Sequence, residues 1–431
     1  MERQYKDSGV EWIGKIPETW GTCKVSQLYN VQLGKMLQPN QITDTDTYEN
    51  YLCAANVGQN ALKFFPLRQM WIQKKERDIY SLSKGDLIVV EGGDVASCDI
   101  IKDNVKNLFF QNALHRVRAK KGYTVDYLRY VLMTAKAVGY IDLICNKATI
   151  SHFTKEKFEN LVIPISHISE QQRIADYLDE KCGEIDSLIG LQEQMIEKLK
   201  AYKQSVITEA VTKGLNPNAK LVPSGIDWIG EIPEAWSKDK VIRCFSKIGS
   251  GTTPKSTDDN LFQGDINWLQ SGDINGGDLF EASKHISKET LSSYSALSVY
   301  QAPFIIIAMY GASVGNISIS HIDACVNQAC CVMSGCKLDF NYAFFALKSA
   351  KPYLIYRAEG GGQPNISQDK IKTLWIPIPP LTEQQAIASY LDEKCADTDR
   401  LIGLKQRKIE KLKDYKKSVI YEAVTGKTII E

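Results

Sequence analysis

Two segments of the chain are repeated almost word for word about half a chain apart. Residues 163–214 begin IPISHISEQQRIADYLDEK, and this segment recurs from residue 376 as IPIPPLTEQQAIASYLDEK, at an offset of 213 positions. A shorter segment, SGVEWIGKIPETW at 8–20, returns as SGIDWIGEIPEAW at 224–236. The chain is therefore predicted to contain two copies of one structural unit in tandem.

The stretches between the repeated segments, about residues 21–162 and 237–375, match only in fragments. Each contains an apolar run typical of a buried strand, LIVV in the first and FIIIAMY in the second. The motifs FQNA and VNQA follow these runs, and then come the helix-like sequences DYLRYVL and NYAFFAL. The inserts are thus predicted to share a mixed α/β fold. Repeated segments that are nearly identical, joined to inserts that differ, indicate a molecule that recognises two different targets.

The repeated segments predict two long helices. Ser169 and Gln172, like Thr382 and Gln385, have the spacing of a capping box. Apolar residues then recur at steps of three, four and seven, which favours an antiparallel coiled coil over a helix pair inside one compact domain. The residues predicted for the coiled-coil seam and for partner docking are Ile174, Leu178, Ile185, Leu188, Leu199, Tyr202, Ile387, Leu391, Leu401, Leu412 and Tyr415.

The predicted fold class is therefore α/β (α+β). We expect two mixed α/β domains, related by a pseudo-two-fold axis and separated by the coiled coil. The predicted boundaries are 1–165 for the first domain, 166–214 for the first helix, 215–378 for a linker and the second domain, and 379–431 for the second helix.

Composition limits the class of protein without naming its partner. The chain is 44% hydrophobic and 24% charged, which is ordinary for a soluble globular protein. No run approaches 18 apolar residues and the first residues lack a signal-peptide core, so a cytoplasmic protein is expected. The net charge of +1 lacks the basic excess of a self-sufficient DNA-binding domain. If the chain binds DNA, partner subunits are expected to supply much of the phosphate-neutralising charge.

Neither the cysteines nor the tryptophans predict a special site. The 11 cysteines form no disulfide framework, and the densest group, between Cys325 and Cys336, has no CxxC pair, so packing is favoured over zinc binding. The tryptophans of the repeated segments could stack on bases, but their matching contexts favour a packing role. These four residues are Trp12, Trp20, Trp228 and Trp236.

The duplicated WIG-x-IP-xx-W opening, EQQ-x-IA-x-YLDEK helix start and EAVT helix end resemble the specificity subunit of type I restriction-modification systems. The resemblance covers essentially the whole chain. It implies two target-recognition domains that each bind one half of a split, asymmetric sequence in double-stranded DNA. It also implies that the helices set the spacing and dock DNA methyltransferase subunits, two of them in our expectation, with restriction subunits as further possible partners.

The resemblance implies no catalysis, metal or cofactor in this chain. S-adenosylmethionine would belong to an adenine methyltransferase partner, and ATP and Mg to a restriction partner. The sequence agrees, because its single Pro-Pro pair follows Ile378 rather than the Asn or Asp of a methyltransferase motif, and no Walker loop is present. Two alternatives remain open at this stage: a standalone regulator with a bipartite site, and a coiled-coil structural adaptor.

Base contacts are predicted at polar loop positions, because Arg, Lys, Asn and Gln can form paired hydrogen bonds with base edges. The candidates in the first domain are Lys35, Gln38, Asn56, Gln59, Gln111, Asn112, His115 and Lys147. The candidates in the second are Ser250, Thr252, Thr253, Lys255, Asp273, Tyr310, Ser313, Gln328, Gln363 and Asn365. A structural role for the amides of FQNA and VNQA is an equal alternative.

Overall fold

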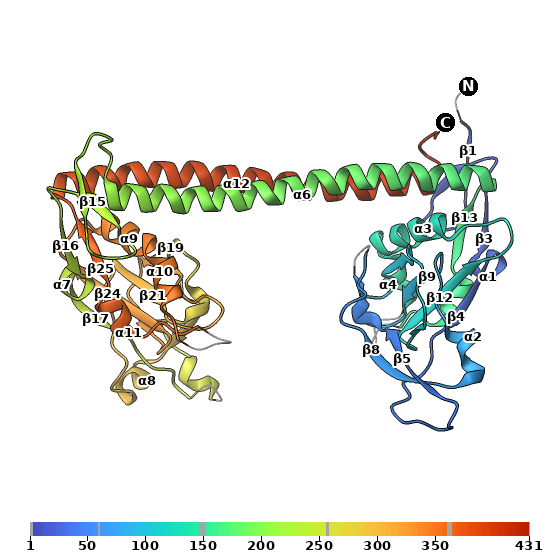
Figure 1. Ribbon diagram of the computed structural model, residues 1–431, viewed down its shortest axis with the longest axis horizontal. Helices are drawn as coiled ribbons and strands as arrows, with labels where there is room; N and C mark the ends of the chain where they lie inside the picture. The colour runs from blue at the N-terminus through green and yellow to red at the C-terminus, as the bar shows by residue number, and fades with distance from the viewer. Residues whose placement is uncertain (1–2, 59–60, 146–151, 256–257, 360–363, 431) are drawn as a thin grey trace. The chain divides into compact units, whose positions relative to one another are not determined.

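The chain divides into two compact units in the computed structural model (Figure 1). Unit 1 contains Met1–Glu193 and Arg407–Glu431, and unit 2 contains Gln194–Gln406. Helices α6 (Ile168–Lys213) and α12 (Leu381–Val424) contribute to both. The described residues are 3–58, 61–145, 152–255, 258–359 and 364–430.

Unit 1 is built on two sheets. The larger is antiparallel throughout, in the order β10-β9-β12-β4, with bounds Cys98–Ile100, Leu87–Val90, Leu114–Ala119 and Tyr29–Leu33. The smaller has the order β11-β5-β8, with bounds Leu108–Phe110, Thr47–Leu52 and Arg68–Ile72, and its β11-β5 pair is parallel. Helix α3 (Val125–Ala137) packs beside β10.

Unit 2 repeats this plan with one more strand. Its larger sheet has the order β17-β24-β21-β22-β19, with bounds Phe245–Gly249, Cys330–Cys336, Phe304–Ala308, Ile317–Ser320 and Asp278–Leu279. Its smaller sheet has the order β20-β18-β23, with bounds Lys284–Ile286, Ile266–Leu269 and Cys325–Val326. Helix α9 (Phe340–Ser349) occupies the place of α3.

Short elements complete each unit. Two-stranded pairs join β1 to β2, β3 to β13 and β6 to β7 in unit 1, with bounds Tyr5–Asp7, Lys15–Pro17, Gly21–Lys24, Val162–Ile165, Val57–Gly58 and Ala61–Leu62. The pairs β14 with β15 and β16 with β25 correspond in unit 2, with bounds Leu221–Pro223, Glu231–Pro233, Ser237–Lys240 and Trp375–Ile378. The short helices are α1 Val25–Leu28, η1 Ala54–Asn56, η2 Lys74–Glu76, α2 Arg77–Tyr80, α4 Tyr140–Ile144, α5 Lys155–Asn160, α7 Val241–Cys244, η3 Asp259–Phe262, η4 Ser271–Asp273, α8 Lys288–Ser293, α10 Lys351–Tyr356 and α11 Gln368–Lys372.

The apolar run in each insert is the central strand of a three-layer arrangement. Side chains alternate across a strand, so Leu87 and Val89 of β9 face the core that includes α3, whereas Ile88 and Val90 face the core under the smaller sheet. Strand β21 divides its side chains between two cores in the same way. A strand buried on both faces has no polar side, which explains the uninterrupted LIVV and FIII sequences. The predicted mixed α/β fold is confirmed.

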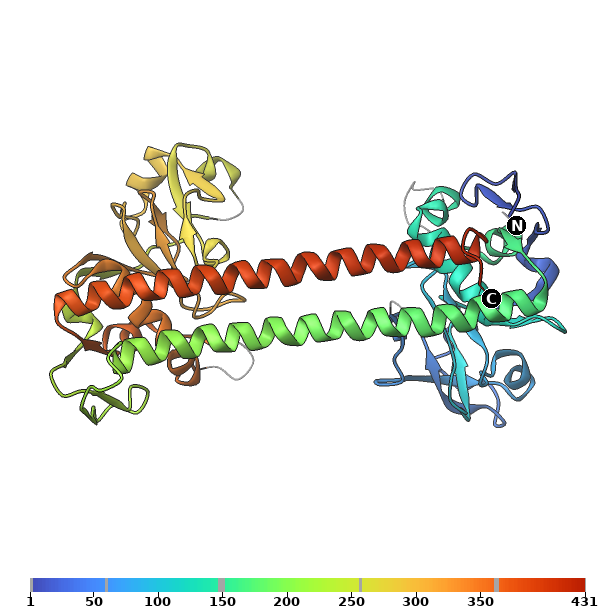
Figure 2. The same cartoon turned by 90° about the horizontal axis from the view of Figure 1, so that it is seen from above.

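The two long helices are antiparallel within each unit, as predicted (Figure 2). In unit 1, Ile174 near the start of α6 shares a core with Val419 near the end of α12, and Lys416 Nζ lies 2.7 Å from Asp186 Oδ2. In unit 2 the opposite ends meet, because Ile207 of α6 shares a core with Ile387 of α12. Lys203 Nζ lies 2.5 Å from Asp399 Oδ2 there.

The predicted seam is wrong over part of its length. Buried as predicted are Ile174, Leu178, Ile185, Ile387 and Leu391; half-buried are Leu199 and Leu412; exposed are Leu188, Tyr202, Leu401 and Tyr415. The buried positions at the middle of the helices are instead Gln192, Ile196 and Ile409. Of the two adjacent residues, Ile189 is more buried than Leu188. Gln192 is buried although it is polar, so the spacing of apolar residues alone does not reveal this register.

The predicted capping boxes are also absent, because α6 starts at Ile168 and α12 at Leu381, which places Ser169 and Thr382 inside the helices. Instead, the first glutamine of the EQQ motif binds the backbone just before each helix. Gln171 Nε2 donates to the Ser166 carbonyl at 2.9 Å, and Gln384 Nε2 donates to the Pro379 carbonyl at 2.8 Å.

The glutamate of the EQQ motif binds a tryptophan of the other repeated segment. Trp20 Nε1 donates to Glu170 at 2.9 Å, and Trp236 Nε1 donates to Glu383 at the same distance. Trp12, Trp20 and Trp236 are buried, and Trp228 is half-buried with its indole nitrogen on a backbone carbonyl. The predicted packing role of the four tryptophans is confirmed.

Candidate nucleic-acid interface

In each unit, a loop that leaves the larger sheet crosses directly over the segment with the repeated Asn and Gln. In unit 1 the Lys35 amide donates to the Phe110 carbonyl at 3.0 Å, and the Asn112 amide donates to the Lys35 carbonyl at 2.9 Å. Gly34 permits this approach, because a Cβ atom there would collide with the Gln111 carbonyl oxygen. The backbone therefore brings Lys35, Gln111 and Asn112 together.

Unit 2 repeats the crossing with other side chains. The Gly251 amide donates to the Asn327 carbonyl at 3.4 Å, and a Cβ atom at Gly251 would collide with the Val326 carbonyl oxygen. The Thr253 hydroxyl donates to the side-chain oxygen of the exposed Gln328. The two units thus share a backbone crossing and present different polar groups from it.

The amides of FQNA and VNQA divide between the two roles considered for them. Asn327 is buried, and its side-chain oxygen accepts the Ala329 amide at 3.0 Å, so this residue shapes the turn. Gln328 is exposed, whereas Gln111 and Asn112 of unit 1 are half-buried. The groups accessible at the crossings are therefore Gln111, Asn112 and Gln328.

Four predicted DNA contacts of unit 1 have buried side chains instead: Lys35, Gln38, Asn56 and His115. Lys35 Nζ lies 2.7 Å from the Gln38 side-chain oxygen and 2.7 Å from the Glu76 carboxylate. This ammonium group already has two oxygen partners inside the domain. It therefore fixes the loop after β4 and is not presented at the surface.

Asn56 and His115 are bound internally as well. Asn56 Nδ2 donates to the Lys63 carbonyl at 3.0 Å, and its side-chain oxygen accepts the Cys53 amide at 3.0 Å. His115 Nε2 donates to the Phe153 carbonyl at 2.8 Å, and burial lowers the pKa of the imidazole. In this structure the four buried residues support the domain, and we propose no base contact for them.

The other predicted contacts reach the surface to different degrees. Half-buried are Gln111, Asn112, Ser250, Thr252, Thr253, Asp273, Tyr310 and Ser313, and exposed are Lys255, Gln328 and Asn365. Gln59, Lys147 and Gln363 lie outside the described residues. Thr253 and Gln328 meet at the crossing of unit 2, and the Ser313 hydroxyl donates to the Ser271 carbonyl in the short helix that also holds Asp273. Base contact by these residues stays a prediction.

Apolar side chains also lie exposed at the loop surface of unit 1, where the sequence predicted only polar base contacts. Met36 and Leu37, next to the buried Lys35, are exposed, and so are Ile42 and Phe65. Phe65 is 89% exposed, which no packing role requires. The available signal was an apolar pair inside a polar segment rich in turn residues, KMLQPNQITDT.

The helix pair carries the same exposed apolar positions in both copies. On α6, Leu188 and Leu191 are 44% and 50% exposed, and their copies on α12, Leu401 and Leu404, are 44% and 49% exposed. The copied tyrosines Tyr202 and Tyr415 are exposed as well. In unit 1, Asp186 of α6 pairs with Lys416 of α12, so Leu188 and Tyr415 lie at about the same height along the helix pair. In unit 2, the pair of Lys203 with Asp399 places Tyr202 and Leu401 in the same way.

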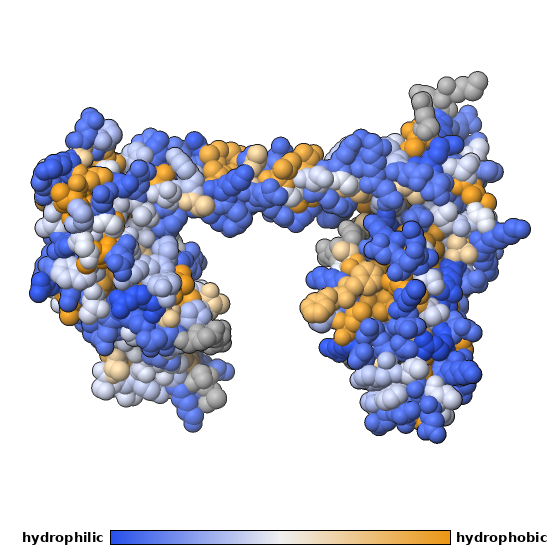
Figure 3. Space-filling view, viewed as in Figure 1, coloured by the Kyte–Doolittle hydropathy of each residue, from blue (hydrophilic) through white to orange (hydrophobic). Residues whose placement is uncertain are grey.

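We call the set Leu188, Leu191 and Tyr415 the unit 1 helix patch, and the set Leu401, Leu404 and Tyr202 the unit 2 helix patch. Figure 3 shows apolar side chains gathered on the surface of the helices. Exposed leucines at matching positions of two diverged copies indicate a shared constraint other than the internal core.

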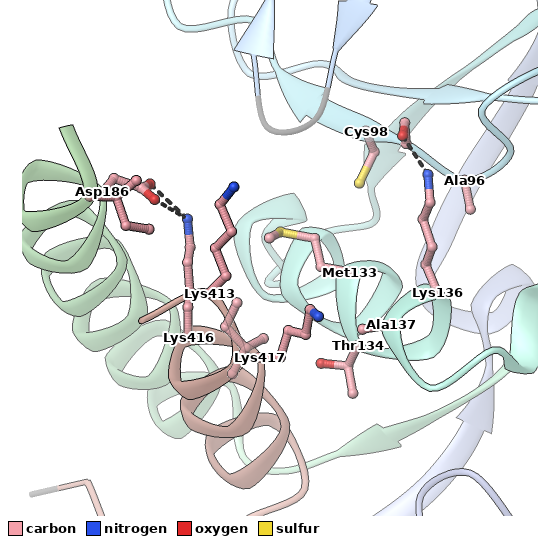
Figure 4. A pocket seen from close by; sticks show the side chains of 13 residues that line it. Ala96, Cys98, Met133, Thr134, Lys136, Ala137, Asp186, Lys413, Lys416 and Lys417 are labelled. Atoms are coloured by element: carbon pink, nitrogen blue, oxygen red, sulfur yellow. Dashed lines mark hydrogen bonds and ion pairs between the residues drawn. The ribbon is translucent and has the colours of Figure 1, made fainter. Parts of the chain in front are cut away.

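A cavity of about 510 Å³ lies in unit 1 where α3 meets α6 and α12 (Figure 4). Its lining carries four lysines, which are Lys136, Lys413, Lys416 and Lys417. Lys416 is paired with Asp186, and Lys136 Nζ donates to the Ser97 hydroxyl at 2.6 Å. Lys136 also pairs with Asp94, and Lys417 pairs with Asp414, so three of the four lysines already have a carboxylate partner.

Neither a metal-binding group nor a membrane span is found in the described part of the chain. No cluster of three or more His, Cys, Asp or Glu side chains there could hold a metal ion. No described helix combines the length and apolarity needed to cross a bilayer. Cys325, Cys330 and Cys331 are buried, and burial raises the pKa of the Cys331 thiol to about 12.

Comparison with known proteins covers nearly the whole chain. The family model of the type I restriction modification DNA specificity domain matches residues 17–201 and again residues 236–414. The MjaVIII specificity subunit of Methanocaldococcus jannaschii, a type I restriction enzyme component, is 25% identical over 96% of this chain and 94% of its own length. The StySPI specificity subunit of Salmonella potsdam is 22% identical over 96% of this chain and 90% of its own length.

Solved structures show the same fold. A chain from a structural study of the assembly and conformational transition of a type I R-M system superposes with a TM-score of 0.69 at 15% identity, covering 95% of this chain and 98% of that one. The HsdS subunit of Thermoanaerobacter tengcongensis gives a TM-score of 0.52 at 15% identity, covering 98% and 100%.

Proposed function

Because the chain belongs to the type I restriction-modification DNA specificity family and is a DNA-recognition subunit, we propose that each of its two domains reads one half of a split DNA target. The two matched family segments each include one α/β domain and part of a long helix. The crossings over the FQNA and VNQA segments support this proposal most directly, because one backbone presents different side chains in the two units. Different side chains would select different bases, so the target would be asymmetric.

Within unit 1, Gln111 and Asn112 are our candidates for adenine contacts, because side-chain amides can pair with the N6 and N7 edge of that base. Gln328 is the corresponding candidate in unit 2, where Thr253 orients its amide. Lys255 and Asn365 are exposed in the same unit and would contact bases or phosphates. The exposed Met36 and Leu37 would add apolar contacts to thymine methyl groups.

The helix patches are our candidate docking surfaces for partner subunits. An exposed apolar patch on a soluble domain usually marks a protein interface. Since the unit 1 and unit 2 helix patches contain the same residues at the same register, they would bind two copies of one partner, which we propose to be the modification methyltransferase subunit. That partner would bring S-adenosylmethionine and the methyl-transfer chemistry, and a restriction subunit would bring ATP and Mg.

This chain would therefore not act as an enzyme by itself. Its contribution is to select the sequence and to hold the partners. Neither a standalone regulator nor a structural adaptor is favoured, because family membership accounts for both the divergent domains and the copied helices.

Selection from a random-sequence DNA library tests the proposal. The chain would be purified alone and in complex with its modification subunit, and bound DNA would be sequenced at two salt concentrations, because phosphate contacts depend on salt. We expect the complex to select one split motif and the chain alone to bind weakly. Selection of a continuous motif by the chain alone would contradict the proposal.

The variants Gln111→Ala and Gln328→Ala sharpen the same selection. Each should relax one position in one half of the motif, and the loss of one base contact costs about 1–3 kcal/mol of discrimination. Asn56→Ala is the matched control within unit 1, because Asn56 is buried. A changed motif for Asn56→Ala with unchanged motifs for the two exposed glutamines would overturn our assignment of the reading residues.

A further inference from the structure

Helices α3 and α9 occupy equivalent places, and matched hydrogen bonds fix their alignment. The buried Tyr127 hydroxyl donates to the Pro164 carbonyl at 3.2 Å, and the buried Tyr342 hydroxyl donates to the Pro377 carbonyl at 3.0 Å. With Tyr127 and Tyr342 aligned, Phe344 of α9 stands where α3 has Arg129. The α6 and α12 sequences align independently through their shared YLDEK segment.

The YLDEK segment places one carboxylate in each unit at the same register, Asp179 in unit 1 and Asp392 in unit 2. In unit 1 the Arg129 guanidinium is paired with Asp179 and lies 3.4 Å from Asp99 Oδ1. It also stacks over the Tyr130 ring at 4.5 Å, and the Tyr130 hydroxyl donates to Asp179 at 2.6 Å. Unit 1 therefore fills this site with its own cation.

Unit 2 retains the carboxylate but has no guanidinium at the position of Arg129, and a different cation, Lys348 Nζ, lies over the Phe344 ring at 5.0 Å. Phe344 and Phe345 replace Arg129 and Tyr130, and no ion pair or hydrogen bond reaches the Asp392 carboxylate from the residues that the structure describes. Burial raises the pKa of Asp392, with Asp278 and Asp339 adding to the effect. Asp392 is an exposed residue, and among the described residues its carboxylate has no protein cation of the kind that Arg129 gives Asp179.

A cavity of about 800 Å³ opens in front of Asp392. Its walls include the rings of Phe280, Phe340 and Phe344. Three aspartates and two lysines line it, but Lys203 is paired with Asp399, and Lys348 Nζ donates to the Gly276 carbonyl at 2.9 Å. A third aspartate, Asp278, accepts from His321 at 2.8 Å. Of the three carboxylates, Asp392 alone has no partner in the described part of unit 2.

The cavity described above in unit 1 has a different lining. Four lysines and one aspartate line it, and Figure 4 shows Lys413, Lys416 and Lys417 projecting from α12 at its edge. Aromatic rings line the unit 2 cavity only. The unit 1 cavity includes neither Arg129 nor Asp179, so it lies beside their site and not at it.

We propose that the cavity beside Asp392 accepts an arginine side chain from a partner protein that docks on unit 2, in the place that Arg129 occupies in unit 1. A carboxylate flanked by aromatic rings suits a planar guanidinium, which can form an ion pair with the carboxylate and stack on a ring. A DNA phosphate would meet the unpaired carboxylate and be repelled. The identification of that partner as the modification subunit rests on the proposed function, whereas the chemistry of the cavity does not.

Titration with N-acetyl-arginine amide tests the cavity without any partner. Saturation-transfer NMR on the full chain should detect its binding, with N-acetyl-citrulline amide as the uncharged control of the same shape. We expect saturable binding of the arginine compound and at least tenfold weaker binding to Asp392→Asn. Equal binding to the wild type and to Asp392→Asn, or no binding of the arginine compound, would overturn the proposal.

The variant Phe344→Arg gives a second, independent test. It places a guanidinium at the position of Arg129, so the chain's own cation should occupy the site and abolish binding of the arginine amide. Its affinity for the modification subunit should fall at least tenfold at unit 2 and stay unchanged at unit 1. Unchanged affinity at both units would overturn the assignment to this partner, and a modification subunit that binds neither chain would contradict the proposed function while leaving the amide titration to decide the cavity.

Discussion

Contacts of single residues explain why certain residues are identical in the two repeats. The glutamate of EQQ accepts from a tryptophan indole in each unit, and the first glutamine closes the helix start. These contacts join the short repeated segment to the long one, although about 150 residues separate Trp20 from Glu170. The motif is therefore a structural joint rather than a binding site.

The indole contact predicts a measurable stability change. Trp236→Phe removes the donor to Glu383, and a hydrogen bond to a charged group contributes about 1.5–3 kcal/mol. We expect the free energy of unfolding of the chain in urea to fall by that amount. Glu383→Gln keeps an acceptor oxygen and should lose less, so an equal or larger loss for Glu383→Gln would contradict this account.

The buried guanidinium of unit 1 predicts a larger change. Arg129→Ala leaves Asp99 buried without its cation, and breaking such a pair costs about 3–5 kcal/mol. Arg400→Ala is the control, because the pair of Arg400 with Asp397 is exposed and worth less than about 1 kcal/mol. Thermal and urea unfolding of both variants measure the difference, and similar losses would show that Arg129 is not a buried support.

At the scale of elements, regular patterns were predictable and contacts were not. The apolar runs predicted β9 and β21, and DYLRYVL and NYAFFAL predicted α3 and α9. The helix seam failed where Gln192 is buried and Leu188 exposed, because periodicity alone cannot show which of two adjacent apolar residues faces a partner helix. The burial of Lys35 and His115 depends on sheet packing, which no local pattern reveals.

Substitutions in the unit 1 helix patch should weaken partner binding without unfolding the chain. Leu188→Ser with Leu191→Ser should change the free energy of unfolding by less than about 1 kcal/mol, since both side chains are already exposed. The same variant should lose one of two bound modification subunits, which native mass spectrometry can count. Ile196→Ala is the contrasting variant, because this buried residue should lose about 2–5 kcal/mol of stability.

Loss of both modification subunits from the Leu188 and Leu191 variant would contradict the assignment of one partner to each patch. Retention of both would show that the patches do not dock the partner.

At the scale of the whole molecule, the repeat was sufficient to predict two domains and two antiparallel helices, and it also predicts where the chain can be reopened. Gly426 after α12 and Gly214 after α6 both have a positive φ and lie against a tryptophan. The Tyr5 hydroxyl donates to the Gly426 carbonyl at 3.3 Å, so the first strand meets the end of α12 within unit 1. In unit 2 a covalent linker makes the corresponding connection.

A circular permutant tests this equivalence. Joining residue 431 to residue 1 through a short linker and opening the chain after Asn216 should preserve the fold, because the new ends lie in an exposed turn. Circular dichroism and methylation activity with the modification subunit measure the outcome. A permutant that fails to fold would show that the two connections are not equivalent.

The central claim is that each domain independently specifies half of one DNA target. The most direct measurement is to co-express the modification subunit with the chain, or with a chain whose residues 21–162 come from another family member, and to map methylated bases across the host genome by single-molecule sequencing. We predict a split motif for the original chain and a motif with only one altered half for the exchanged chain. A change in both halves, or in neither, would contradict the account.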